Sequence, residues 1–169
     1  MKKNSKGLFL FLCIVLLLST TSCQNKTVYF EDIHLGMSRD EILEVKIEWG
    51  NPPTLEEDYM SFSDVKYNDQ NIDATYTFDS DDKLVHASIS TPFEEKEESS
   101  GYNKLVKNVS RQYGKATKLG NNATMWKIKR NEIDEYILCL RDTINNWFVL
   151  ILCTQELYDE IIQHGSKSY

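Results

Sequence analysis

The side chains that could act as metal ligands, nucleophiles or acid–base groups are scattered through this chain. The three histidines, His34, His86 and His164, lie far apart, and no two of them have the spacing of metal ligands. There is no Gly-x-Ser-x-Gly nucleophile motif and no glycine-rich phosphate loop. Residues 79–83 share their aspartates with calcium loops, but Lys83 and the missing glycine favour a hairpin turn. The sequence therefore predicts no catalytic residue, no metal and no cofactor, and we expect the protein not to be an enzyme.

Two cysteines of the folded part, Cys139 and Cys153, flank an expected hairpin. If the turn is centred on Asn146, they lie opposite each other, with Cβ atoms about 4.5–5.5 Å apart and within reach of a disulfide. The alternative is two buried free thiols, which a one-residue change of register would enforce. The sequence leaves both alternatives open. Neither cysteine has the basic surroundings of a reactive nucleophile.

The N-terminal region has the pattern of an export signal. Lys2, Lys3 and Lys6 precede an apolar run, Leu8–Leu18, which is shorter than the ~20 residues of a membrane-spanning helix. Small and hydroxyl-bearing residues then lead to Cys23. This arrangement resembles the signal of bacterial lipoproteins, in which such a cysteine becomes the acylated first residue of the mature protein.

The lipoprotein resemblance implies a signal peptide over 1–22, lipid attachment at Cys23, and a tether over 23–35. Thr20 departs from the family pattern, which usually has leucine there, and an ordinary cleaved signal with an incidental cysteine is the alternative. Gln24, not Asp, follows the cysteine. We therefore expect a lipid anchor in the outer membrane facing the periplasm if the source is Gram-negative. In a Gram-positive source the same signal places the protein outside the plasma membrane.

Charge and length narrow the classes of partner. The chain has 169 residues with 19 basic and 26 acidic side chains, and without the three signal lysines the net charge is −10. This balance argues against nucleic acid and against electrostatic docking on anionic lipid. The length after Cys23 suits one domain.

Residues 36–163 are predicted to form a single α+β domain in which one unit occurs twice. The first helix begins at a capping box, Ser38 to Glu41, and cannot continue through Pro52-Pro53. Its apolar face recurs 64 residues later: Ile42, Val45, Trp49 and then Gly50 in the first unit, and Val106, Val109, Tyr113 and then Gly114 in the second.

Three strand-like runs follow each helix: Tyr59–Phe62, Ile72–Phe78 and Leu84–Ser90 in the first unit, and Thr124–Lys129, Tyr136–Arg141 and Trp147–Thr154 in the second. We therefore expect two tandem helix-strand-strand-strand units, about 36–91 and 100–154, with the helices on one face of an antiparallel sheet. An acidic linker over 94–101 is predicted to be a solvated loop or a frayed helix start. A C-terminal amphipathic helix over 156–163 uses Leu157, Ile161 and Ile162.

The first unit resembles a known family in one segment. Gly36-Met37-Ser38, followed by Trp49-Gly50-Asn51-Pro52, is similar to the signature of small outer-membrane assembly lipoproteins of the BamE (SmpA/OmlA) type. Trp49 replaces the usual leucine, and Ala116 replaces the proline in the second copy. The resemblance implies helices packed on an antiparallel sheet and an envelope role; no partner-contacting residue is carried over. The tandem units also look like the beta-lactamase inhibitor protein fold.

Aromatic residues provide the remaining functional signal. About two-thirds of nine rings in the two predicted sheets are expected to fill the core, and the remainder to form a concave protein-binding face: Tyr59, Phe62, Tyr67, Tyr76, Phe78, Trp126, Tyr136, Trp147 and Phe148. We therefore expect a membrane-anchored lipoprotein that binds or helps assemble an envelope protein. The alternative is a periplasmic inhibitor or immunity protein that blocks a hydrolase or toxin.

Overall fold

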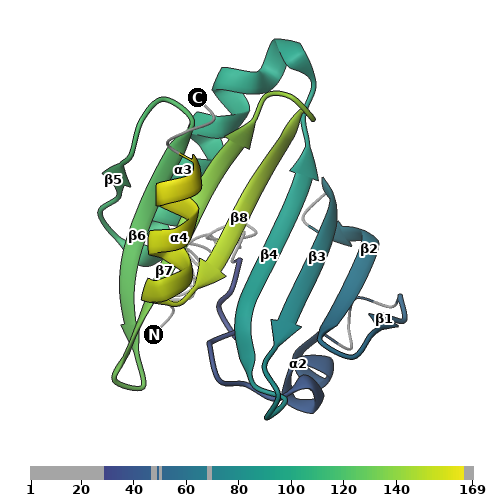
Figure 1. Ribbon diagram of the computed structural model, residues 1–169. Helices are drawn as coiled ribbons and strands as arrows, with labels where there is room; N and C mark the ends of the chain where they lie inside the picture. The colour runs from purple at the N-terminus through teal and green to yellow at the C-terminus, as the bar shows by residue number, and fades with distance from the viewer. Residues whose placement is uncertain (1–28, 47–48, 50, 68–69, 166–169) are drawn as a thin grey trace, which may run out of the picture.

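The computed structural model describes residues 29–46, 49, 51–67 and 70–165. These residues form an open eight-stranded antiparallel sheet with three α-helices (Figure 1). The predicted α+β class is therefore confirmed. The strand order is β1-β2-β3-β4-β8-β7-β6-β5, so each half of the chain contributes four neighbouring strands and the halves meet between β4 and β8.

The elements follow one another in the same order in both halves. The first half contains α2 (Arg39–Lys46), β1 (Thr54–Leu55), β2 (Tyr59–Tyr67), β3 (Gln70–Phe78) and β4 (Leu84–Pro92). The second contains the 3-10 turn η2 (Glu95–Glu97), α3 (Glu98–Tyr113), β5 (Thr117–Lys118), β6 (Ala123–Arg130), β7 (Ile133–Asp142) and β8 (Trp147–Cys153), and α4 (Gln155–Gly165) follows. All six predicted strands are present. The edge strands β1 and β5 were not expected, because two residues are too few to show an alternating pattern.

The predicted capping box starts α2. The Ser38 N–H donates to Glu41 Oε2 at 2.7 Å, and the Glu41 N–H donates to Ser38 Oγ at 3.3 Å. Met37 and Ile42, on either side of the cap, are both buried. The helix ends at Lys46, and the predicted stop at Gly50 lies outside the described residues.

The second predicted helix is α3, and its apolar face is confirmed. Val109 is buried, and Val106 and Tyr113 pack partly buried against the same core. Gly114 follows with φ +87°, and its N–H donates to the Ser110 carbonyl at 2.9 Å. A left-handed residue at this position suits glycine because it has no Cβ. The acidic linker forms η2 and the first turn of α3, which fits the frayed-start alternative.

The two faces of the sheet carry different cores. On the face that we call the helix face, α2 and α3 cover the larger core, which includes Ile137 and Cys139 of β7. On the opposite face, the front face, α4 lies across β6 and β7 (Figure 1). Its apolar side chains pack there against Tyr136 and Leu138. The helices of the two halves, α2 and α3, thus share one face as predicted, and the C-terminal helix α4 covers the other, which the sequence did not predict. Neighbouring residues of β7 point to opposite faces, and both sets are apolar, so each face needs a cover.

The segment before α2, residues 29–37, is part of the domain, and we call it the strap. Five of its side chains are buried in the helix-face core: Tyr29, Phe30, Ile33, Leu35 and Met37. Two backbone hydrogen bonds join it to β4. The Gly36 N–H donates to the Leu84 carbonyl at 2.8 Å, and the Leu84 N–H donates to the Met37 carbonyl at 2.8 Å. Residues 29–35, which the sequence pattern assigned to the tether, thus fold with the domain.

Candidate functional site

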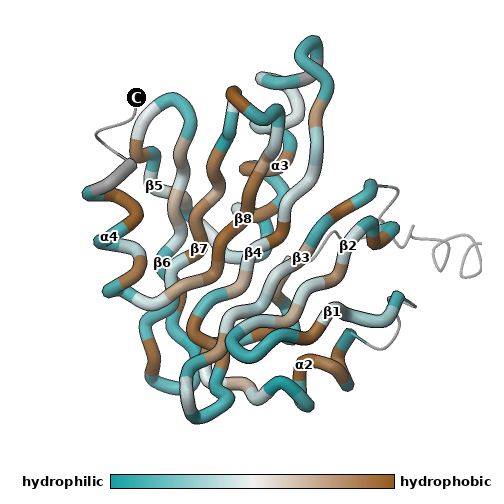
Figure 2. Tube along the Cα trace, turned by 45° about the vertical axis from the view of Figure 1, so that its right-hand side comes forward, coloured by the Kyte–Doolittle hydropathy of each residue, from teal (hydrophilic) through white to brown (hydrophobic). Residues whose placement is uncertain are grey.

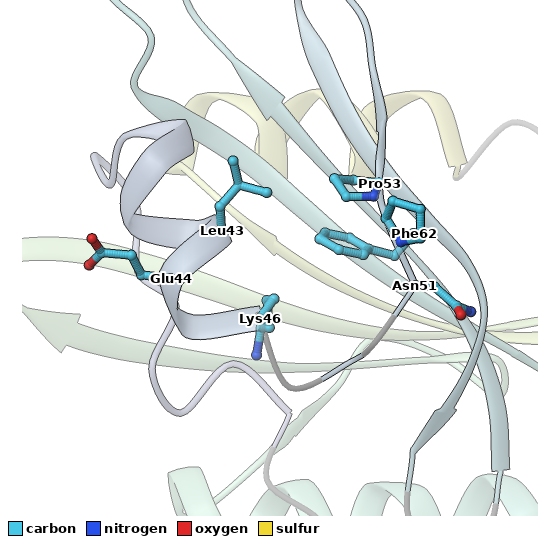
Figure 3. Close-up of a pocket in the computed structure, with 7 residues that line it drawn as sticks. Leu43, Glu44, Lys46, Asn51, Pro53 and Phe62 are labelled. Carbon is cyan, nitrogen blue, oxygen red and sulfur yellow. The ribbon is translucent and has the colours of Figure 1, made fainter.

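An open groove of about 460 Å³ lies between α2 and the beginning of β2 (Figure 3). Leu43 comes from α2, and Pro53 and Phe62 come from the facing segment (Figure 3). The full lining is Leu43, Glu44, Lys46, Asn51, Pro52, Pro53 and Phe62. The groove is thus mostly apolar, with charged side chains at its rim.

Local sequence explains how the groove forms. Pro52-Pro53 cannot extend the helix, so the chain turns and β2 brings Phe62 opposite α2. Trp49 packs edge-on against Phe62 with 5.1 Å between ring centroids. Lys46 places its ammonium 4.8 Å from the centre of the Trp49 ring, and burial lowers the pKa of this lysine. The wall near Phe62 is therefore held by ring contacts.

The apolar surface continues beyond the groove. Leu55 of β1 is 54% exposed. It pairs with Met60, a buried residue of the helix-face core, so Leu55 also points to the helix face. An exposed leucine beside an apolar groove with a charged rim has the composition of a protein-binding surface rather than of a catalytic cleft.

About two-thirds of the nine aromatic rings are buried, as the sequence predicted, but the remaining rings do not form one cluster on the surface. Six of the nine rings are buried: Phe62, Tyr76, Phe78, Trp126, Tyr136 and Phe148. Of the other three, Tyr59 and Trp147 lie on the front face in strands β2 and β8, while Tyr67 packs 6.2 Å from Trp49. The expected concave aromatic face is therefore wrong, because these three residues are far apart on the sheet and on different faces.

The two cysteines are free and buried. The register that would place them opposite each other is not found: Cys139 pairs with Leu150, and Cys153 pairs with Tyr136. In this register Cys139 points to the helix-face core and Cys153 to the core under α4, so the sheet separates them. Burial raises the pKa of each thiol to about 12. The structure thus has the free-thiol alternative, not a disulfide.

The described histidines are held by separate local contacts. His34 Nδ1 lies 3.0 Å from the Leu35 carbonyl, and His86 Nδ1 lies 3.4 Å from Thr77 Oγ1. Burial lowers the pKa of His86. The side chain of His164 lies outside the described residues. Among the described side chains, no group of three His, Cys, Asp or Glu residues is placed to hold a metal ion.

A partly buried ion pair that the sequence did not reveal holds the strap. Arg130 donates to the carbonyls of Phe30, at 2.9 Å, and Ile33. Its Nε lies 3.7 Å from Glu135 Oε2, and Glu135 Oε1 accepts the Leu35 N–H at 2.8 Å. Burial raises the pKa of Glu135, although the Leu35 N–H and Arg130 oppose the shift. Each residue sits in a strand with an ordinary pattern, and only the fold brings them to the strap.

The predicted lipid-attachment residue, Cys23, and the rest of the export signal lie outside the described residues. Within the described ranges, no helix has the length and apolar character needed to cross a bilayer. Comparisons with protein-family models, with curated proteins and with solved structures found no match.

Sequence reasoning also missed the groove. Leu43 lies outside the predicted apolar face of its helix, and the two prolines were interpreted only as a helix stop. The sequence did contain a signal for this groove. Leu43 is an apolar residue beside the buried face of a short helix, and a double proline follows that helix.

Proposed function

We propose that this protein is a lipid-anchored protein of the cell envelope whose non-enzymatic domain binds another protein. The observation that carries the proposal is the open apolar groove between α2 and β2 with exposed Leu55 beside it. Surfaces of this kind accept apolar side chains of a partner, and a polar rim then excludes water. The absence of nucleophile and metal motifs from the sequence supports a binding role.

The anchor in this proposal is an acylated Cys23. The mature chain then has few residues before it enters the strap, which is fixed to the domain by Arg130 and by its buried side chains. Two or three acyl chains hold such a protein stably, whereas one gives only marginal binding. We place it on the periplasmic face of the outer membrane in a Gram-negative source, and outside the plasma membrane in a Gram-positive one.

The domain itself is proposed to be two copies of one unit. Strands β1–β4 begin at residues 54, 59, 70 and 84, and strands β5–β8 begin at 117, 123, 133 and 147, so each begins 63 or 64 residues after its counterpart. The strand order is also symmetric about the β4–β8 pair. This agreement supports the tandem arrangement and the resemblance to the BamE type and to the inhibitor fold.

A second candidate is an inhibitor or immunity protein that blocks a hydrolase or toxin. The tandem units favour it through their likeness to the inhibitor fold. The front face of β3 and β4 also favours this candidate, because its polar side chains are only partly buried: Thr75, Thr77, Ser88 and Ser90. Such a flat polar face can add contacts around a central apolar anchor.

Photo-crosslinking in intact cells of the source organism tests the proposal. A photoreactive amino acid replaces Leu55, and the matched control replaces Ile144, an exposed residue of the β7–β8 turn that is 86% accessible. We expect Leu55 to give a specific crosslinked protein that Ile144 does not give. An integral envelope protein as the product favours the assembly role, and a soluble hydrolase or toxin favours the inhibitor role. Identical products, or none, at both positions would contradict binding at the groove.

A further inference from the structure

The outward side of α3 carries a row of positive charge. Lys104, Lys107 and Arg111 are all exposed and recur at i, i+3 and i+7, which places them on one side of the helix. We call these three residues the basic stripe. They lie opposite the buried side chains of the same helix, Tyr102, Leu105 and Val109. The stripe therefore points directly away from the sheet.

The stripe is not neutralised by neighbouring carboxylates. Within the described part of the chain, none of its three side chains lies within 4.0 Å of a carboxylate oxygen. Arg111 donates a hydrogen bond of 3.4 Å to the neutral Asn108 Oδ1. Lys115 and Lys118, just beyond the helix, are also exposed. A uniformly basic stripe is unexpected in a chain with 26 acidic and 19 basic residues.

The strap begins beside the C-terminal end of this helix. One guanidinium, that of Arg130, donates both to the Phe30 carbonyl at 2.9 Å and to the Tyr113 hydroxyl at 3.3 Å. Tyr113 is the last residue of α3. The point where the chain enters the domain is therefore next to the end of α3 that carries Arg111.

The proposed anchor, Cys23, is only a few residues before the start of the strap in the sequence. Six residue steps separate Cys23 from Tyr29, and a fully extended chain of that length reaches about 20 Å. The domain cannot stand far from the bilayer if Cys23 is acylated. Whichever surface lies near the start of the strap is then held near the lipid headgroups.

We propose that the basic stripe of α3 rests on the anionic phospholipid surface of the membrane that holds Cys23. This inference depends on the lipid anchor of the proposed function. It places the outward side of α3 against the bilayer and turns the front face of the sheet away from it. Membrane attachment then uses two signals, acyl chains and a basic surface, which act together.

Charge elsewhere on the molecule limits how the domain can lie. The net charge by itself predicts repulsion from anionic lipid, but beyond a Debye length of about 8 Å other charges are screened. Glu94, Glu95 and Glu98 stand at the opposite end of α3, and Glu31 and Asp32 are close to the strap entry. The three glutamates at the N-terminal end of α3 favour a tilt in which the C-terminal part of the helix lies nearest the headgroups. Glu31 and Asp32 beside the strap entry oppose this contact and reduce its strength.

The size of the effect follows from the number of charges. Each lysine or arginine near an anionic surface changes the partition by about fivefold. Reversing all three charges of the stripe should therefore reduce the population lying on the membrane by at least about 100-fold.

The test uses the full lipidated protein in vesicles that contain a nitroxide-headgroup lipid as a quencher. A fluorescent probe is attached at Asn108→Cys, beside the stripe, or at Ser88→Cys on the front face. The native Cys139 and Cys153 are buried and do not compete for the label. Mass spectrometry first establishes whether Cys23 carries acyl chains.

We expect strong quenching at position 108 and weak quenching at position 88 when the vesicles contain phosphatidylglycerol, with the difference lost in high salt or in pure phosphatidylcholine. The triple variant Lys104→Glu/Lys107→Glu/Arg111→Glu should lose the quenching. The control Lys66→Glu/Lys83→Glu/Lys129→Glu has the same charge change at exposed positions elsewhere and should retain it.

Equal quenching at the two positions, or no effect of the triple variant, would overturn the orientation while leaving the lipid anchor intact; a protein-binding role for the stripe would give this result. A chain that carries no acyl group would instead overturn the proposed anchoring, and the inference with it.

Discussion

The two halves of the sheet differ systematically on the front face. Strands β3 and β7 begin 63 residues apart, as do β4 and β8, so their positions can be matched. Five matched front-face pairs in the middle of these strands are Asp73 and Tyr136, Thr75 and Leu138, Thr77 and Leu140, Ser88 and Ile151, and Ser90 and Cys153. At each of these five positions the first half is polar and the second is apolar. Figure 2 shows the corresponding hydrophobic colouring along α4, β7 and β8.

This difference shows how the two halves, although they have the same order of strands, can have different roles. In the second half the apolar front face requires α4 as a cover, and the same half holds the strap through Arg130. In the first half the front face stays open, and the groove and Leu55 lie on its helix face. The second half therefore holds the strap in place, and the open front face and the groove both belong to the first half.

The largest effect is expected at the last residue of β6. Arg130 corresponds to Lys66, the eighth residue of β2, which is exposed. Arg130→Ala should lower the free energy of unfolding by about 3 kcal/mol, because the buried Glu135 and the strap carbonyls lose their partner. Lys66→Ala should change it by less than about 0.5 kcal/mol. Denaturant titrations of the two variants measure this difference.

A second variant separates the ion pair from a general defect. The residue matched to Glu135 in the first half is Ile72, which is buried. The double variant Arg130→Met/Glu135→Ile should recover much of the loss, because no unpaired charge remains. A double variant less stable than Arg130→Ala would contradict this explanation.

The next largest effect on stability is expected in the core between α4 and the front face of the sheet. Leu138→Ala removes a fully buried side chain from beneath α4 and should cost about 3 kcal/mol. The matched change Thr75→Ala, on the open front face, should cost less than about 0.5 kcal/mol. Thermal or chemical unfolding compares them directly. Similar costs at the two positions would mean that the halves are not covered differently.

A smaller effect is expected where the two helices begin. Ser38 caps α2 through reciprocal bonds with Glu41, whereas Glu94, which precedes η2 and α3, makes no side-chain capping bond. Ser38→Ala should cost about 1 kcal/mol. Glu94→Ala should leave stability almost unchanged. If the two substitutions had equal effects on the denaturation midpoint, the capping box would not stabilise α2.

The smallest effect is a pH dependence at one front-face position. His86 corresponds to Val149 in the second half, and burial lowers its pKa from the ordinary value of 6.5. Its contribution to stability is therefore present above 6.5 and is lost as the pH falls from 6.5 through the lowered pKa of the folded state, because the unfolded state binds the proton more readily in that range. His86→Val should lose this part of the pH dependence. A wild-type minus variant difference that stays constant from neutral to mildly acidic pH would rule out this role.

The sequence predicted the local elements well because local signals determine them. The capping box at Ser38, the apolar face of α3 and the alternating strands all depend on near neighbours. The side of the sheet chosen by α4 was missed, although Tyr136 and Leu138 alternate with Ile137 and Cys139 as apolar residues on both faces. Such a strand signals that both faces are covered.

Contacts between residues far apart in the sequence could not be predicted from local sequence patterns. The turn between β7 and β8 sets the register, and a shift there moved Cys139 and Cys153 to opposite faces. The Arg130–Glu135 pair and the groove at Leu43 depend on segments that meet only in the folded chain. A sequence pattern reports the face of an element but not which segment will lie against it.

The central claim is that the strap joins this domain to a lipid anchor at Cys23. Metabolic labelling with a clickable palmitate analogue tests it most directly, using wild type, Cys23→Ser and the matched control Cys13→Ser, whose cysteine lies within the apolar run of the signal. We predict label in wild type and in Cys13→Ser, and loss of label with release from the membrane fraction in Cys23→Ser. Equal labelling of wild type and Cys23→Ser would contradict the account.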